Sequence, residues 1–466
     1  MLLYLIFSIL IASAAFLARN ERQINLLGGG FYLVQALFTG MLLGGGWFGQ
    51  ISLSLFSFDA AGTLFYLLLV LISLYAFIHS EAYLHGNSLH EMRIYAGLLM
   101  LLTTSITGVY FANNLAVTWI FLEATTLCSA GIIYHRRTAT TLEAAWKYLF
   151  VCSTGIAMAY LGILLLTATT HCESLNYQTL TEVAATGNPL YLKTAFLLIL
   201  AGYSCKMEIF PLYTVGVDAN FAAPSPASAL ISTGLVNAGF LAVLRVYLVM
   251  AHTEIFPWVR SVLLLVGIFS LIIGALFLRR TNNYKRFLSY STVENMGIAA
   301  IGLGIGGVGV WAAVFHVVCH TLIKSSLFFQ IAVVRQIYDG YRINRIGDYI
   351  HINRVGAIGL LAGMVVLVAF PPSPLFLSEL MILREAISAE KWWLVAGMAL
   401  LLCIVIYSFC SRLISLCYQP NQDRLHPSKR DRALSWSALS LLLLAMVLGL
   451  WQPEFLTRLI DQIVAL

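Results

Sequence analysis

The sequence predicts an all-α polytopic membrane protein with about 14 transmembrane helices. Of its 466 residues, 60% are hydrophobic and only 10% are charged, whereas a soluble globular chain carries about 25% charged residues. Apolar stretches of roughly 20 residues, the length that crosses a bilayer, follow one another with almost no polar length between them. The composition therefore excludes a soluble core, and we find no soluble domain in the sequence.

The apolar stretches predict the order of the spans. The first, 2–18, lacks the basic start and the small-residue cleavage site of a secretory signal, so we expect a retained helix there. The other spans are expected at 26–48, 59–79, 94–112, 114–134, 143–169, 191–220, 227–250, 258–279, 285–306, 309–335, 353–388, 392–418 and 434–452.

Prolines interrupt the seventh and the twelfth of these spans. Proline removes a helical hydrogen bond and clashes with the preceding turn, and in lipid such backbone survives only when it is buried or lines a cavity. The interrupting residues are Pro211, Pro224 and Pro226 in and after 191–220, and Pro371, Pro372 and Pro374 in 353–388.

The two interruptions lie five spans apart, a pattern typical of transporters with internal repeats. We therefore expect two five-helix repeats in inverted orientation, at 94–250 and 258–418. N-terminal helices at 1–93 precede them, and a C-terminal helix with a short tail follows at 434–466.

Basic residues gather in alternate loops. By the positive-inside rule these loops face the cytoplasm, which places both termini on the outer, periplasmic side of the cell inner membrane. Lys285 belongs to such a loop, so we expect it to be solvated. The basic residues are Arg19 and Arg22; Arg136 and Arg137; Arg279, Arg280, Lys285 and Arg286; Arg335, Arg342, Arg345 and Arg354; and Arg424, Lys429, Arg430 and Arg432.

Several ionisable residues lie inside the expected spans, where a charge costs several kcal/mol and marks a candidate functional site. His316, His320 and Lys324 recur at a spacing of four, which keeps them on one helix face. The others are Glu123, Lys206, Glu379 and Arg245. A purely structural alternative, charge pairs that fix helix packing, stays open at this point.

These residue types suit proton transfer. Desolvation lowers a lysine pKa and a nearby carboxylate raises it, so a Glu–Lys pair that can separate acts as a switch. Histidine titrates near neutrality and suits a relay. We therefore predict that Glu123 and Lys206 form one coupled ion pair, and that Lys324 takes part in transport.

No cofactor, metal or nucleic-acid site is expected. The eight cysteines, Cys172 among them, occur singly, without the paired spacing of iron–sulfur or zinc sites. The histidine stripe continues to Lys324, a cation, which disfavours a metal. The glycine runs at 28–30 and 44–46 lie in apolar surroundings and are expected to permit close helix packing.

Taken together, the motifs resemble the antiporter-like subunits of respiratory complex I, Mrp antiporters and membrane-bound hydrogenases, over roughly 110–390. The motifs are Leu122-Glu123-Ala124-Thr125-Thr126-Leu127; Lys206-Met207-Glu208-Ile209-Phe210-Pro211-Leu212; Asp218 to Leu230; Lys285 to Gly297; and His316-Val317-Val318-Cys319-His320-Thr321-Leu322-Ile323-Lys324. Val293-Glu294-Asn295-Met296-Gly297, Asn237 and the stretch Pro371 to Glu379 are most similar to the F-type membrane component of hydrogenase 4.

The resemblance implies a role for each site residue. Glu123 would control Lys206, the stripe from His316 through His320 to Lys324 would carry protons along the membrane midplane, and Glu379 would be the terminal site. The chain departs from the family pattern at several positions: Tyr213-Thr214-Val215 replaces the usual His-x-Trp, and Asn283-Tyr284-Lys285-Arg286 replaces the usual Asp-x-Lys-Arg. Asn237 stands where many relatives have a central lysine, and Glu208 adds a second carboxylate beside Lys206.

The resemblance also implies a function, namely a proton- or cation-translocating subunit of a redox-driven complex of group 4 hydrogenase or complex I-like type. Its partners would be other membrane subunits, a peripheral redox or catalytic arm and the lipid bilayer. An Mrp-type cation/proton antiporter module, the membrane subunit of an inorganic-carbon uptake system, and an inert scaffold or quinone-site element remain as alternatives.

Overall fold

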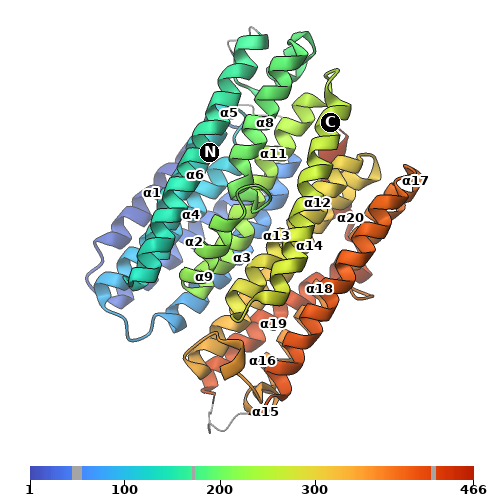
Figure 1. Ribbon diagram of the computed structural model, residues 1–466. Coiled ribbons are helices and arrows are strands. Elements are labelled where there is room, and N and C mark those ends of the chain that lie inside the picture. Colours follow the sequence, from blue (N-terminus) through green and yellow to red (C-terminus); the bar gives the residue numbers. More distant parts are fainter. Residues whose placement is uncertain (45–54, 171–173, 421–426, 466) are drawn as a thin grey trace.

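The computed structural model describes residues 1–44, 55–170, 174–420 and 427–465, and within these ranges every regular element is helical (Figure 1). Cys172, Arg424, Gly45 and Gly46, which the sequence singled out, lie outside the described residues. The chain is a multi-pass membrane protein, as its composition predicts.

Eleven spans among the described residues are long and apolar enough to cross a membrane. They are α2 (Glu21–Gly44), α3 (Ala60–Tyr83), α4 (Leu89–Tyr110), α5 (Leu115–Ile133), α6 (Ala139–Thr170), α8 (Pro189–Met207), the continuous stretch Ser225–Met250 formed by α10 (Ser225–Leu230), a π-helical turn (Ile231–Leu235) and α11 (Val236–Met250), α12 (Phe256–Arg280), α14 (Val308–Tyr338), α18 (Trp392–Tyr418) and α19 (Lys429–Leu450).

The remaining α-helices are shorter or less apolar. They are α1 (Leu2–Phe16), α7 (Tyr177–Val183), α9 (Thr214–Ala222), α13 (Tyr284–Ile305), α15 (Tyr349–Ile352), α16 (Arg354–Leu367), α17 (Pro374–Ser388) and α20 (Glu454–Val464). The helices α13 and α17 nevertheless pack directly on α14, which lies inside the bundle.

The two helix interruptions lie where the prolines predict them. Helix α8 ends at Met207, the Phe210–Pro211 peptide is cis, and α9 begins at Thr214. Helix α16 ends at Leu367, the Pro371–Pro372 peptide is cis, and α17 begins at Pro374. The second half-helix starts cleanly because the Ser373 side chain accepts a hydrogen bond from the Phe376 N–H at 3.1 Å, a normal N-cap arrangement.

Two helix starts are built in the same way. Asn114 caps α5 by accepting a hydrogen bond from Ala116 N, and the chain beside it pairs with the segment after α6 through Leu115 N to Leu175 O at 2.9 Å.

Asn283 caps α13 by accepting a hydrogen bond from Lys285 N, and the chain beside it pairs with the segment after α14 through Tyr284 N to Tyr341 O at 3.0 Å. Both caps have an extended backbone, with φ of −140° and −141°.

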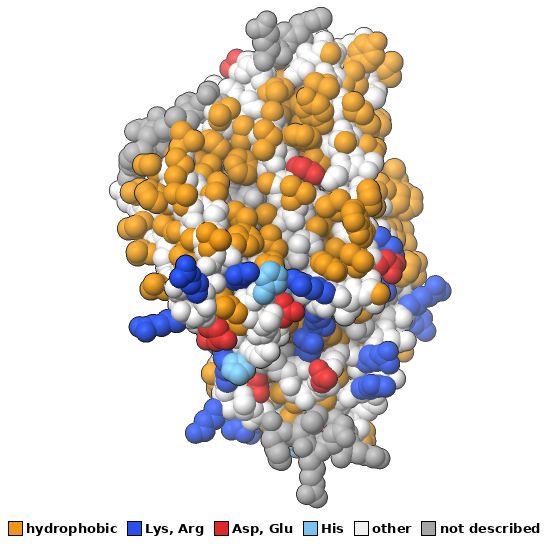
Figure 2. All heavy atoms as spheres, turned by 90° about the vertical axis from the view of Figure 1, so that its left-hand side faces the viewer, with side chains coloured by type: hydrophobic (Ala, Val, Ile, Leu, Met, Phe, Trp, Pro, Cys, Tyr) orange, Lys and Arg blue, Asp and Glu red, His pale blue; other side chains and the backbone are white. Residues whose placement is uncertain are grey.

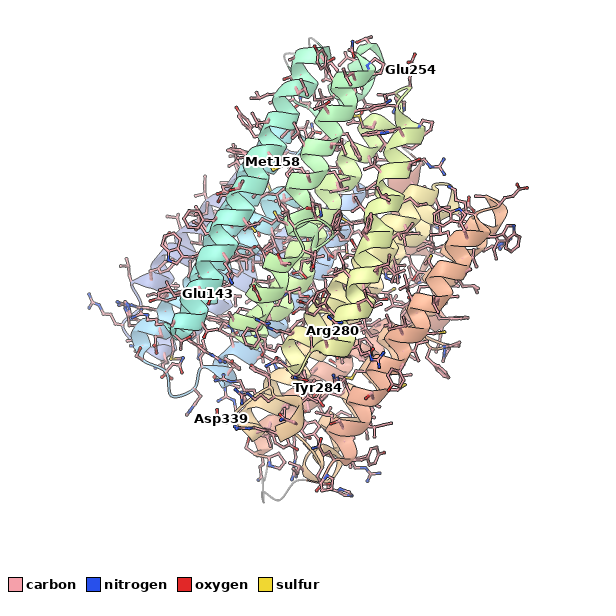
Figure 3. All side chains as sticks on the ribbon, in the orientation of Figure 1. Glu143, Met158, Glu254, Arg280, Tyr284 and Asp339 are labelled. Atoms are coloured by element: carbon pink, nitrogen blue, oxygen red, sulfur yellow. The ribbon has the colours of Figure 1, made fainter. Side chains whose placement is uncertain are left out.

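Charged side chains concentrate at one end of the molecule. Figure 2 shows a broad band of hydrophobic side chains with lysines and arginines gathered below it, and Arg280, Tyr284 and Asp339 lie at that lower end in Figure 3, opposite Glu254. The basic loops meet there: Arg136 and Arg335 both donate hydrogen bonds to the Tyr83 hydroxyl. Both termini are marked toward the upper end of the bundle in Figure 1.

The expectation that Lys285 is solvated is wrong. Its side chain is fully buried, donates hydrogen bonds to the carbonyls of Ala223 and Phe221, the latter at 3.3 Å, and lies over the Tyr341 ring. The cause is the end of α9 at Ala222, because the last carbonyls of a helix need donors from outside it. Lys285 supplies that donor from the start of α13.

Helix α14 forms the centre of the bundle. It packs against α3, α10, α13, α16, α17 and α19, and the apolar stretch that would cross the membrane is completely buried. The ionisable side chains within that stretch, His316, His320 and Lys324, are therefore shielded from both water and lipid by neighbouring helices.

Candidate functional site

The stripe on α14 lies entirely inside the bundle. His316, His320 and Lys324 have no exposed surface. Lys324 Nζ donates to the hydroxyl of Ser291 on α13, and His316 Nδ1 lies 2.9 Å from the hydroxyl of Ser378 on α17. Neither ring nitrogen of His320 has a hydrogen-bond partner among the described residues. The stripe thus runs from α13 to α17 with an unsatisfied imidazole at its middle.

Three buried carboxylates accompany this stripe. Glu294 lies one turn after Ser291, the hydrogen-bond partner of Lys324, on α13. Glu379 directly follows Ser378, the partner of His316, on α17, and Glu208 lies at the α8–α9 break. Exposed fractions are 2% for Glu208, 2% for Glu294 and 6% for Glu379. Together with Lys324 they form a buried series, from the α8–α9 break through α14 and α13 to α17.

Glu294 is the member of this series that sequence reasoning did not select as a site residue. It lies within a span expected at 285–306, and the rule applied to Glu123, a carboxylate inside an apolar span, selects it equally well. From the sequence, Glu294 was noted only as part of a motif that resembles the F-type component of hydrogenase 4.

Glu208 lies at the break after α8. Its backbone is left-handed, with φ of 56°, and forms the C-terminal cap of α8. Oε1 accepts a hydrogen bond from Asn220 Nδ2 at 2.9 Å, whereas Oε2 and Asn220 Oδ1 have no partner within the described ranges. Because a buried acceptor without a donor is costly, the break presents two oxygens suited to a water or a proton.

Asn237 is buried on α11 and bonded to α14. Its Nδ2 donates to Thr321 Oγ1 at 2.9 Å, and the Thr321 hydroxyl lies 3.1 Å from Asn237 Oδ1. Thr321 directly follows His320, so Asn237 holds the backbone of the histidine stripe. A neutral amide thus occupies the position where the family resemblance implied a lysine.

The expected direct contact between Glu123 and Lys206 is not formed. No ion pair within 4.0 Å joins them among the described residues; instead Ser153 donates to Glu123 Oε1 at 2.7 Å, and Lys206 Nζ donates to the Tyr148 hydroxyl at 3.1 Å. Ser153 and Tyr148 both belong to α6.

Helix α6 packs closely on α8. A Cβ atom at Gly155 of α6 would lie only 3.0 Å from the backbone oxygen of Gly202 on α8, so the two helices approach to backbone contact. Small residues permit such approach between membrane helices. Helix α6 thereby places its own side chains beside Glu123 and beside Lys206.

Arg245 belongs to a different environment from the other buried charges. It donates to the carbonyls of Val109, Tyr110 and Ala112 at 2.6–3.1 Å and pairs with Asp59 at 2.9 Å. Arg245 thus joins α11 to the end of α4 and the start of α3. This arrangement fits the structural alternative raised from the sequence.

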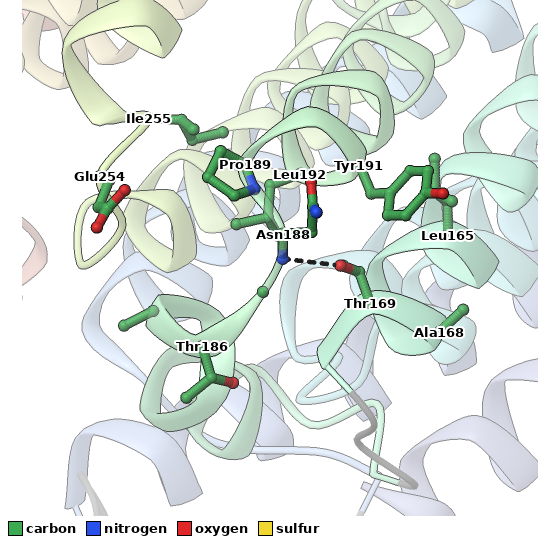
Figure 4. Close-up of a pocket in the computed structure, with 12 residues that line it drawn as sticks. Leu165, Ala168, Thr169, Thr186, Asn188, Pro189, Tyr191, Leu192, Glu254 and Ile255 are labelled. Carbon is green, nitrogen blue, oxygen red and sulfur yellow. Dashed lines mark hydrogen bonds between the residues drawn. The ribbon is translucent and has the colours of Figure 1, made fainter.

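One open pocket lies away from these residues. An open pocket of about 840 Å³ is lined by the end of α6, the start of α8 and the loop before α12 (Figure 4). Thr169 accepts a hydrogen bond there from the backbone of Asn188 at 3.0 Å. None of its lining residues belongs to the carboxylate series or to the α14 stripe.

The fold and this interior define a class: a multi-pass α-helical membrane protein with ionisable residues buried across the centre of its bundle. Residues 112–406 match the family described as "NADH:quinone oxidoreductase/Mrp antiporter, TM". This match covers more than half of the chain, and the chain therefore belongs to that family of antiporter-like membrane subunits.

Curated relatives agree with this assignment. A "Hydrogenase-4 component F homolog" of Methylacidiphilum infernorum is 28% identical over 414 residues, covering 86% of each chain. An "NADH-quinone oxidoreductase subunit N" of Ectopseudomonas mendocina is 27% identical over 414 residues, covering 84% of this chain and 81% of the relative.

Two solved structures share the fold. A chain of the membrane-bound sulfane sulfur reductase, an archaeal respiratory membrane complex, superposes with a TM-score of 0.86 at 22% identity, covering 99% of this chain and 96% of that one. A chain of the Mrp complex from Dietzia superposes with a TM-score of 0.85 at 17% identity, covering 100% and 97%.

Proposed function

We propose that this protein is the proton-translocating membrane subunit of a redox-driven complex of group 4 hydrogenase or complex I-like type. One observation carries the proposal: the buried series of Glu208, Lys324, Glu294 and Glu379 crosses four elements of the bundle without an exposed member. Ionisable groups buried at such cost in a membrane protein mark ion pathways.

The chemistry of the series suits stepwise proton movement. Lys324 shares the interior with three buried carboxylates, and in a low-dielectric interior adding or removing one proton at a member changes the energy of nearby charges. His316 and His320 extend the series along α14. Each of these imidazoles has a ring nitrogen without a hydrogen-bond partner among the described residues, and such a nitrogen can accept or donate a proton.

The flanking residues take supporting roles in this proposal. Glu123 and Lys206 act as a switch whose halves are separated in this conformation by α6, through Ser153 and Tyr148. Asn237 keeps the histidine stripe in place through Thr321 rather than carrying a proton itself.

We further propose 14 membrane spans, in place of the eleven selected by length and hydropathy. The three additional spans are α1, α13 and the broken pair α16–α17. The matching caps at Asn114 and Asn283, with equivalent backbone pairings to the segments after α6 and α14, support two five-helix repeats at 94–250 and 258–418. The N-terminal helices 1–93 and the C-terminal segment 434–466 flank them.

The basic end of the bundle would face the cytoplasm by the positive-inside rule, with both termini on the outer side of the inner membrane. Redox chemistry would reside in partner subunits and a peripheral arm. A cation/proton antiporter module is the second candidate. It is favoured by the similarity to a component of an Na(+)/H(+) antiporter from Bacillus subtilis, which is 28% identical over 317 residues.

The decisive substitution is Lys324→Met in the full complex, assayed for pH-dye quenching in sealed membrane vesicles. We expect proton flux per assembled complex to fall about tenfold or more, the effect of losing a positioned proton carrier. Lys147→Met is the matched control, because Lys147 is exposed and pairs only within α6 with Glu143.

Wild-type flux in Lys324→Met would refute the proposal and favour an inert scaffold. The same assay with a sodium-sensitive dye in place of the pH dye distinguishes a proton-translocating subunit from a cation/proton antiporter module. Sodium uptake that depends on Lys324 would support the antiporter module instead.

A further inference from the structure

Glu294 occupies a distinctive place in the bundle. It lies on α13, which packs against α9, α12, α14 and α17, and it is 2% exposed. Helix α12 closes one side of it, because a Cβ atom at Gly274 would lie 2.5 Å from Glu294 Cβ. The carboxylate is therefore held inside the protein rather than at a lipid-facing surface.

The contacts of Glu294 give no structural reason for burying it. Within the described part of the chain no ion pair within 4.0 Å involves it, and its hydrogen-bond donor, Asn295, is its own neighbour on α13. Asn295 also donates to the Ser291 carbonyl. Glu294 thus joins no two helices, and a carboxylate buried at high cost contributes no bond to packing.

The surroundings instead connect Glu294 to two titratable groups. Lys324 of α14 reaches α13 one turn before Glu294, and Glu379 lies on α17, which packs directly on α13. Lys324 donates a hydrogen bond to the Ser291 hydroxyl, and Asn295 donates one to the Ser291 carbonyl. Ser291 lies one turn before Glu294 on α13. The other charged groups on the packed elements are Asp218 of α9, which pairs with Arg286 at 3.1 Å, Arg260, Arg279 and Arg280 of α12, Arg335 of α14, and Arg384 and Glu385 of α17.

We infer that Glu294 is a proton carrier that receives a proton from Lys324 and passes it to Glu379. This inference rests on the proposed function and adds a residue to its pathway. In the first step the Lys324 ammonium loses a proton and the Glu294 carboxylate gains it. In the second step the Glu294 carboxylic acid gives that proton to the Glu379 carboxylate.

The first step converts an ammonium and a carboxylate into two neutral groups. Separated charges are costly in a low-dielectric interior, so neutralising both at once is favoured there over moving a single net charge. Asn295 then serves as a positioning residue, because it donates a hydrogen bond to the Glu294 carboxylate.

The test compares Glu294→Gln, Glu294→Asp and the exposed control Glu143→Gln in the full complex, alongside Lys324→Met. We expect Glu294→Gln to lower proton flux per assembled complex about tenfold or more. Glu294→Asp, which keeps the acid with shorter reach, should retain intermediate flux. The control should match the wild type.

Infrared difference spectroscopy between acidic and alkaline pH gives a second readout that a structural role would not move. The carboxyl band of a protonating Glu294 should shift in Glu294→Asp, even where Glu294→Gln fails to assemble. Wild-type flux in Glu294→Gln, or an unchanged carboxyl band in Glu294→Asp, overturns the inference. If Lys324→Met still abolishes flux in that case, only the assignment of Glu294 fails; if it does not, the proposed function fails as well.

Discussion

Removing the Arg245 side chain should destabilise the protein without stopping transport. Arg245 lies near the end of α11, and its guanidinium donates to three backbone carbonyls at the end of α4, at 2.6–3.1 Å. It also pairs with Asp59, whose side chain caps α3 by accepting from Gly62 N at 2.7 Å. One residue thus ties α11 to two other helices.

The magnitude follows from these contacts. Hydrogen bonds from a charged donor contribute about 1.5–3 kcal/mol each, and there are three to carbonyls. The pair with Asp59 adds at most about 1 kcal/mol, because 38% of the Asp59 side chain is exposed and solvent screens it. The shorter glutamine amide can still donate to a carbonyl but carries no charge, so we expect Arg245→Gln to cost about 3–5 kcal/mol.

The assay is the thermal unfolding of the purified full-length chain in detergent, with proton flux per assembled complex measured on the same variant. The control is Arg458→Gln, whose side chain is 75% exposed and pairs with Glu454 within α20. An unchanged Tm for Arg245→Gln would refute the structural role. A normal Tm with lost flux would make Arg245 a pathway candidate again.

Three further predictions concern residues of the proposed pathway and its surroundings. Glu379→Gln should stop net proton flux at normal complex yield, while Glu379→Asp keeps part of it; low yield with normal flux per complex would instead make Glu379 an assembly contact. Glu123→Gln should impair proton flux while assembly survives. Ser153→Ala should lower proton flux in the same direction but more weakly, as measured in sealed vesicles. Lys285→Met should reduce the yield of folded protein, measured by size-exclusion chromatography, because the Ala223 carbonyl loses its donor; unchanged yield would contradict that role.

Local features of the sequence were enough to predict the membrane class and the helix breaks. Hydropathy is summed along the chain, and proline acts on its own turn, so neither depends on distant residues. The same holds for the stripe of His316, His320 and Lys324, because a spacing of four residues keeps side chains on one face of any helix.

Contacts between helices could not be obtained in this way. When nearly every face of a helix is apolar, hydropathy does not say which face meets which neighbour, since lipid and protein interior are equally apolar. For that reason the sequence left Lys285 in a loop and paired Glu123 directly with Lys206. It likewise passed over Glu294.

What the sequence determined by itself was a many-span helical membrane protein with two broken helices and costly charges inside it. The tertiary structure decided how those charges are grouped. It brings Glu208, Lys324, Glu294 and Glu379 into one buried series, and Arg245 joins α11 to α3 and α4. The physical reason is that small residues such as Gly155, Gly202 and Gly274 set how closely the helices approach, and that approach selects which side chains meet.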